Sequence, residues 1–211
     1  GLEGKSAAQV GCNNARELLS LASLKVIPSV GIDQSGAFLE QGRVLAKAAG
    51  LEPRLIEADI YDLPDDVGTF DLVLVTIGVL NWMPDLGGFF RVIAGLLGPG
   101  GHLLVYETHP VMEMFDPESD TPHEPAISYF RTDPLKEEGL ISYDGVDHGA
   151  GETGYWFIHT LGQIVTSCAT AGMTITSLKG FGYSIREPGY DVYEGREAQI
   201  PMSYLLHARK M

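Results

Sequence analysis

The first half of the sequence alternates short apolar runs with amphipathic stretches, and this alternation constrains the fold more than any other feature. Strand-like runs are expected at 5–10, 27–32, 54–57, 70–75 and 102–107, and helices at 14–24, 35–49 and 85–97. Strands and helices that alternate at this spacing form βαβ units, in which each helix returns the chain so that the strands pair in parallel. The sequence therefore predicts an α/β fold, Rossmann-like and doubly wound.

The later part of the chain predicts how the sheet ends. A helix is expected at 161–171, followed by strands at about 174–181 and 201–209. This order closes a mostly parallel, seven-stranded sheet with an antiparallel C-terminal strand, so we expect a single domain over 1–211. Between about 109 and 154 the chain carries several prolines and no sustained period. This irregular insertion is expected to lie over the functional site, with a disordered surface excursion as the alternative.

Composition excludes several classes of function. Asp and Glu number 28 against 14 Lys and Arg, a formal net charge of -14, so the surface repels phosphate backbones and no nucleic-acid partner is expected. Cys12 and Cys168 are far apart and form no disulfide framework, which favours a reducing, cytoplasmic environment. No apolar run approaches the roughly 20 residues that span a bilayer, so no membrane partner is expected. Asp147, His148 and Glu152 match no familiar ligand spacing, and no metal is expected.

A turn of small residues follows the first strand. Gly11-Cys12-Asn13-Asn14-Ala15 lets a ligand approach the backbone closely, and it opens onto the amino end of a helix, where free N–H groups and the dipole favour polar ligands. Asp33 and Gln34 follow the second strand, where a carboxylate can accept from both hydroxyls of an adenosine ribose. An ordinary tight turn with a helix-capping Asp33 is the alternative.

The ends of the third and fourth strands add to this pattern. Asp59, after the third strand, can accept from an exocyclic amino group while Ile60 packs on a purine face; a plain turn cap is the alternative. Thr76 and Ile77 follow the fourth strand, and Leu97-Gly98-Pro99-Gly100-Gly101 precedes the fifth.

Taken in this order, the motifs resemble those of the class I S-adenosylmethionine-dependent methyltransferases over nearly the whole chain. The resemblance implies S-adenosyl-L-methionine as cofactor and methyl transfer to a small-molecule acceptor, with O or N favoured over C, as in a bacterial subgroup that acts on small molecules. It places the 109–154 insertion near the acceptor. The cofactor-binding residues that it implies are Gly11, Cys12, Asn13, Asp33, Gln34, Asp59, Ile60, Thr76 and Ile77.

Three positions depart from the family pattern. Gln9 stands where the family has an acid; it can orient loop amides but cannot balance a positively charged ligand. Asn13 and Ala15 stand where the family has glycines, although Asn adopts the left-handed conformation better than most residues. A catalytically silent ligand-sensing or interaction module is therefore the alternative. An NAD(P)-dependent oxidoreductase is disfavoured, because Asn13 and Arg16 occupy glycine positions of the dinucleotide fingerprint.

Two histidines are candidate catalytic residues. His109 follows the fifth strand and His159 precedes the 161–171 helix, and either is suited to act as general base toward a hydroxyl or a protonated amine. A structural role is the alternative for both. By the same resemblance, Trp82 and Met83 are expected to contact the cofactor or the acceptor, with a core role as the alternative. The oligomeric state is left open by the sequence.

Overall fold

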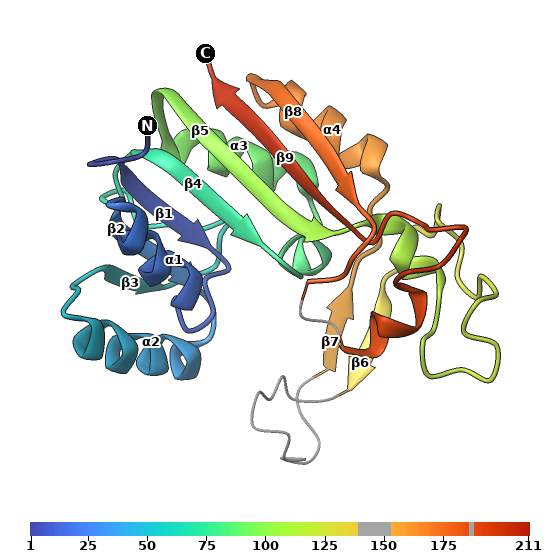
Figure 1. Ribbon diagram of the computed structural model, residues 1–211. Helices are drawn as coiled ribbons and strands as arrows, with labels where there is room; N and C mark the ends of the chain where they lie inside the picture. The colour runs from blue at the N-terminus through green and yellow to red at the C-terminus, as the bar shows by residue number, and fades with distance from the viewer. Residues whose placement is uncertain (139–152, 186–187) are drawn as a thin grey trace.

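A seven-stranded sheet organises the computed structural model, which describes residues 1–138, 153–185 and 188–211 (Figure 1). The strands lie in the order β3-β2-β1-β4-β5-β9-β8. Their bounds are β1 Ser6–Val10, β2 Ile27–Asp33, β3 Arg54–Glu57, β4 Phe70–Thr76, β5 Leu97–Thr108, β8 Met173–Phe181 and β9 Ser203–Lys210. Strands β1 to β5 pair in parallel, and β9 is antiparallel to both β5 and β8. The predicted fold class is confirmed.

Helices cover both faces of this sheet, as expected for a doubly wound fold. The helices are α1 Arg16–Ser20, α2 Gly36–Ala49, α3 Leu86–Leu96 and α4 Leu161–Thr170, with short 3-10 segments η1 Leu21–Leu24, η2 Leu80–Trp82, η3 Pro110–Met114 and η4 Pro188–Tyr193. Figure 1 shows α1 and α2 beside β1 to β3, and α3 and α4 behind β5, β9 and β8. Because successive strand residues point to opposite faces, Ala7 and Ala8 of β1 belong to two different buried clusters.

Local sequence signals account for most helix ends. The hydroxyl of Ser35 accepts from Phe38 N at the start of α2, and the helix ends at Gly50, whose φ is 67°. Asp85 caps α3 by accepting from Gly88 N at 2.9 Å. A side-chain acceptor at the first position and glycine past the last one are the usual boundaries of a helix. The predicted helices therefore match the observed ones closely at these ends.

Two predicted boundaries differ from the structure. The helix expected at 14–24 is divided into α1 and η1, and it begins only at Arg16 because Ala15 is left-handed, with φ 57°. The strand expected from 102 begins at Leu97, which pairs with Phe70 before a shift of register. The glycine-rich run after α3 is therefore an irregular start of β5.

The insertion expected at about 109–154 contains a second, two-stranded sheet that the sequence pattern did not predict. β6 Leu135–Glu138 pairs antiparallel with β7 Thr153–Trp156. Asp147, His148 and Glu152 lie outside the described residues. Met112, Tyr193 and Met202 form a separate buried cluster that joins η3, η4 and the start of β9. None of the helices in the described ranges has the length and apolarity needed to cross a membrane.

Candidate functional site

A cavity of about 720 Å³ lies where the parallel strands β1 to β4 end. Ligands bind at the carboxyl ends of the strands in open α/β sheets, because loops from neighbouring strands converge there. Every residue predicted to bind the cofactor lines this cavity, namely Gly11, Cys12, Asn13, Asp33, Gln34, Asp59, Ile60, Thr76 and Ile77. The motifs that the sequence spreads over four strand ends thus face a single space.

The turn after β1 depends on left-handed backbone at three positions. Gly11, Asn13 and Ala15 have φ of 61°, 50° and 57°. A Cβ at Gly11 would overlap the side chain of Val79, which closes over the turn from the end of β4. The expectation that Asn13 preserves the turn is met in the geometry, and Ala15 adopts a conformation that costs a non-glycine residue about 1–2 kcal/mol.

Asp33 ends β2 with both carboxylate oxygens held in place. Oδ2 accepts from the backbone N of Asn13 at 2.7 Å, and Oδ1 accepts from the backbone N of Ser35 at 2.9 Å. An ionised carboxylate offers about four acceptor sites, so each oxygen can still accept from a ligand hydroxyl. Asp33 is thus fixed in orientation and available to the cavity.

Asp59 is partly used by its own loop. Its Oδ1 accepts from the backbone N of Tyr61 at 2.9 Å, the local turn that the alternative interpretation expected. Ile60 beside it is buried at 5% exposure and still lines the cavity. Asp59 and Asp33 therefore face the same cavity, Asp59 exposed at its rim and Asp33 half-buried.

Gln9 supports the site from inside the protein. Its side chain is fully buried; Oε1 accepts from Leu18 N at 2.9 Å and Nε2 donates to Thr76 Oγ1 at 3.0 Å. Gln9 was expected to orient loop amides, and it instead ties the first turn of α1 to the end of β4. Cys12 is also buried, and burial raises the pKa of its thiol, so Cys12 contributes shape and backbone rather than a reactive thiolate.

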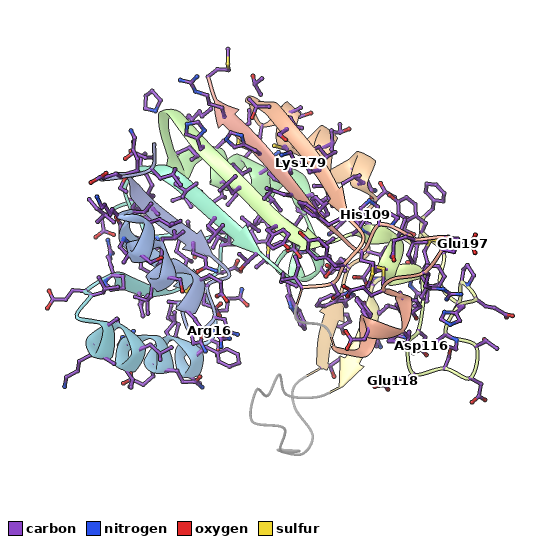
Figure 2. The ribbon with its side chains drawn as sticks, in the orientation of Figure 1. Arg16, His109, Asp116, Glu118, Lys179 and Glu197 are labelled. Atoms are coloured by element: carbon purple, nitrogen blue, oxygen red, sulfur yellow. The ribbon has the colours of Figure 1, made fainter. Side chains whose placement is uncertain are left out.

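Neither candidate catalytic histidine lines the large cavity. His109 is 9% exposed, accepts from Val111 N through Nδ1 and packs edge-on against Tyr204; burial lowers its pKa. Figure 2 shows it well away from the cavity-lining Arg16. His159 donates from Nε2 to the carbonyl of Met83 at 2.8 Å, and burial lowers its pKa as well. Both rings are engaged in the local structure, as the alternative interpretation expected.

One part of the cavity lining, called its apolar end below, is mainly aromatic and apolar. It is formed by Trp82, Met83, Pro84, Tyr106 and Ile185. Trp82 packs edge-on against Trp156 of β7, with ring centroids 5.3 Å apart. Tyr106 of β5 was missed by the sequence analysis; burial, followed by its neighbour Tyr183, raises the pKa of its phenol. Strand alternation, which turns Tyr106 to the opposite face from Val105, was the signal that could have found it.

Comparison with known proteins agrees with this geometry. Residues 8–105 match the family described as methyltransferase domain. The chain is 40% identical over 84 residues to a demethylmenaquinone methyltransferase of Thermus thermophilus, a stretch that is 38% of this chain and 36% of that protein. The matched stretch thus spans well under half of that curated relative.

Solved structures resemble the whole chain rather than one part of it. A crystal structure of an S-adenosylmethionine-dependent methyltransferase from Listeria monocytogenes superimposes with a TM-score of 0.71 at 18% identity, covering 100% of this chain and 92% of that one. Another from Mesorhizobium loti gives 0.68 at 19% identity, covering 99% and 92%. At this level of identity the likeness establishes a common fold.

Proposed function

We propose that the chain is a small-molecule methyltransferase, because residues 8–105 match the family described as methyltransferase domain and the whole chain shares the fold of solved S-adenosylmethionine-dependent methyltransferases. The cofactor is S-adenosyl-L-methionine. The observation that carries the proposal is that Asp33, Asp59 and the Gly11 turn, separated in sequence, line one cavity of about 720 Å³. Ligand cavities of this kind measure about 300–1,000 Å³.

The residues present fit an adenosyl ligand. Asp33 has acceptor sites left for the two ribose hydroxyls, and Asp59 with Ile60 provides an acceptor and an apolar surface for a purine. Glu17 of α1 also lines the cavity, which adds a carboxylate near the turn where Gln9 supplies none. We propose that Glu17 offsets the positive charge of the ligand, and that the Gly11 turn holds its amino-acid end.

The chemistry asks little of the protein beyond placement. S-adenosylmethionine supplies a methyl group already activated by a sulfonium, so the protein must align the acceptor and exclude water. Trp82, Met83 and Ile185 line the apolar end of the cavity, where the acceptor is aligned and water is excluded. The Tyr106 phenol is protonated at neutral pH, as any tyrosine of ordinary or raised pKa is, and it can hydrogen-bond to an acceptor hydroxyl or amine.

An aromatic or otherwise apolar small molecule fits this end best. The relative from Thermus thermophilus is named for demethylmenaquinone, which supports a small-molecule acceptor. We propose O or N as the methylated atom ahead of C. His109 and His159 have no place in this scheme, because both lie outside the cavity lining.

Titration calorimetry with S-adenosylmethionine and, separately, with NAD tests the proposal. We expect one site for the first ligand and none for the second. Asp33→Ala should weaken binding by about 10- to 150-fold, because it removes charge-assisted hydrogen bonds of about 1.5–3 kcal/mol. Asp65→Ala, an exposed carboxylate that does not line the cavity, is the matched control.

Three outcomes would contradict the proposal: heat with NAD alone, heat with neither ligand, or unchanged affinity in a folded Asp33→Ala variant. Transfer of a labelled methyl group to the small-molecule fraction of a metabolite extract then tests the activity. Label that appears only in protein or nucleic acid would contradict the proposed acceptor class.

A further inference from the structure

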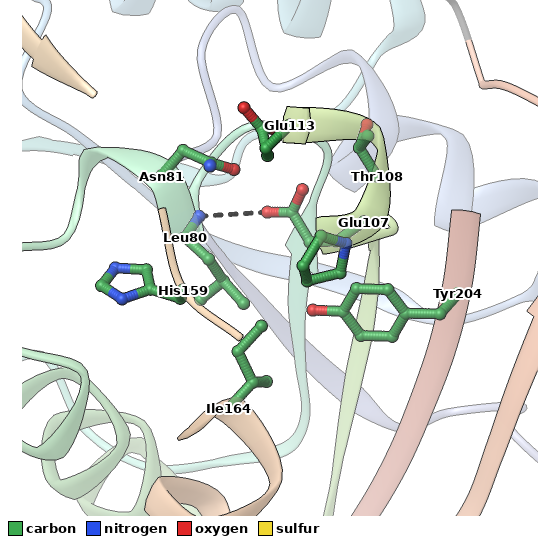
Figure 3. Close-up of a pocket in the computed structure, with 9 residues that line it drawn as sticks. Leu80, Asn81, Glu107, Thr108, Glu113, His159, Ile164 and Tyr204 are labelled. Carbon is green, nitrogen blue, oxygen red and sulfur yellow. Dashed lines mark hydrogen bonds between the residues drawn. The ribbon is translucent and has the colours of Figure 1, made fainter. Parts of the chain in front are cut away.

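Glu107, the next residue after Tyr106 on β5, is a buried carboxylate that the methyl-transfer scheme does not use. It is 2% exposed. Its Oε2 accepts from the backbone N of Gly78 at 2.6 Å, and its Oε1 accepts from the backbone N of Leu80 at 3.1 Å. Figure 3 shows the second of these bonds. The carboxylate therefore holds the amides on both sides of Val79.

The segment that Glu107 holds is the wall of the large cavity. Gly78 and Val79 both line that cavity, and Val79 is the residue that closes over the glycine at position 11. Asn81, two residues after Val79, is paired in both directions with Phe157: its carbonyl accepts from Phe157 N at 2.7 Å, and its Nδ2 donates to the Phe157 carbonyl at 3.0 Å. Glu107 thus holds this wall on the side away from the large cavity, and the opposite side of the wall faces the cavity.

Glu107 faces several polar side chains across a small space. A small cavity of about 10 Å³ separates it from Tyr204 of β9, Glu113 of η3 and His159 before α4 (Figure 3). Of the described residues that line this small cavity, none is a lysine or arginine. Glu113 already accepts from Trp156 Nε1 at 2.9 Å, and the Tyr204 hydroxyl has no hydrogen-bond partner among the described residues.

This environment disfavours charge on Glu107. Burial raises the pKa of its carboxyl to about 8, and the amides of Gly78 and Leu80 lower it in part. His109, which packs against Tyr204, adds no opposing charge because burial lowers its own pKa. A buried carboxyl without a cation is costly, and such groups concentrate at functional sites.

We propose that Glu107 is a positioning residue for methyl transfer: by binding the amides of Gly78 and Leu80 it fixes the wall shared by cofactor and acceptor. This inference rests on the function proposed above. The ionised carboxylate accepts fully at both oxygens, whereas the neutral acid accepts well at only one. The wall should therefore be held more tightly as the pH rises through the ionisation of Glu107.

Glu107→Gln tests this inference, because Gln keeps the shape but only one acceptor oxygen. At pH 9, where Glu107 of the wild type is mostly ionised, amide hydrogen exchange of the ligand-free protein should show protection of Gly78 and Leu80 falling about tenfold in the variant. In the wild type, protection corrected for intrinsic exchange should rise across pH 7–9, and in the variant it should stay level. With ligand, affinity for S-adenosylmethionine should fall about tenfold and kcat should lose its rise near pH 8.

Glu113→Gln is the matched control, because it changes a carboxyl in the same small cavity that binds Trp156 instead. It should leave the protection of Gly78 and Leu80 unchanged. Equal protection in wild type and Glu107→Gln, or equal loss in both variants, would overturn the inference. Should Glu107→Gln fail to fold, a wild-type protection profile that is flat across pH 7–9 would overturn it. Exchange is measured without ligand, so absence of S-adenosylmethionine binding would refute the proposed function alone.

Discussion

Asp33 and Glu107 use the same hydrogen-bonding arrangement at two places around the cavity, with opposite consequences. Each carboxylate accepts from two backbone amides of the loops beside it. Asp33 is half-buried and opens onto the cavity, whereas Glu107 is 2% exposed and lies behind the wall. Burial, and not the number of amide donors, therefore decides whether the carboxyl oxygens are open to a ligand or only hold the protein around it.

Gly11 lies in the turn that Asp33 holds through Asn13, and it packs against Val79, which lies between the two amides that Glu107 holds. Crowding this contact should have the largest effect. Gly11→Ala places a Cβ against the Val79 side chain at a backbone φ of 61°. Left-handed strain of about 1–2 kcal/mol adds to overpacking of about 1–3 kcal/mol. We expect denaturant unfolding to show a loss of about 2–5 kcal/mol, with S-adenosylmethionine binding lost as well.

Gly50→Ala is the control for that prediction. Gly50 has a similar φ of 67°, but no atom lies within 4 Å of its added Cβ. It should therefore cost only the backbone strain of about 1–2 kcal/mol. An equal loss of unfolding free energy in Gly11→Ala and Gly50→Ala would show that the Val79 side chain moves away from the new methyl group. Asp33 and Glu107 would then act independently.

The pH dependence of stability sharpens the comparison next. Because the pKa of Glu107 in the folded protein is raised to about 8 from its ordinary value of 4.5, the folded protein holds a proton that the unfolded chain releases between those pH values. Unfolding free energy should therefore fall as pH rises through this window, by up to about 1.4 kcal/mol per pH unit for one proton. Above pH 8 this contribution is level.

Glu107→Gln should remove that slope. Urea titrations at several pH values between 5 and 8 measure the difference in unfolding free energy between wild type and variant, and we expect the variant to gain relative stability as pH rises. A variant that is more stable yet binds S-adenosylmethionine more weakly would separate positioning from folding. If the unfolding free energies of wild type and Glu107→Gln change in parallel with pH, the pKa of Glu107 lies in its ordinary range.

That the residues predicted to bind the cofactor line one cavity could be predicted from the sequence, because their determinants are local. Asp33 is the last residue of β2, Asp59 follows the end of β3 by two residues, and the Gly11 turn is a continuous run, so strand ends alone bring them together. Glu107 and His109 lie two residues apart, and the sequence favours the histidine because an unperturbed imidazole titrates near neutral pH. The role of Glu107 depends on amides 29 and 27 residues earlier in the chain. No short motif records that contact.

The β6–β7 sheet was missed for a related reason. Its strands have four residues each and pair across a long sequence separation, from Leu135 with Trp156 to Glu138 with Thr153. Trp156 then packs on Trp82, which places a late segment against a loop of the fourth strand. Strands this short show no reliable period, so only tertiary contacts reveal them.

The smallest effect is expected at Tyr204, and it tests whether Glu107 has a hidden partner. The Tyr204 hydroxyl is buried without a hydrogen bond among the described residues, as is that of Tyr193 in the cluster with Met112. Tyr204→Phe and Tyr193→Phe should each raise the unfolding free energy by about 1 kcal/mol, because each removes an unsatisfied hydroxyl. Thermal unfolding at pH 7 measures both. Stabilisation by Tyr193→Phe alone would mean that Tyr204 bonds to Glu107 in solution, so that the carboxyl holding the cavity wall is itself held by β9.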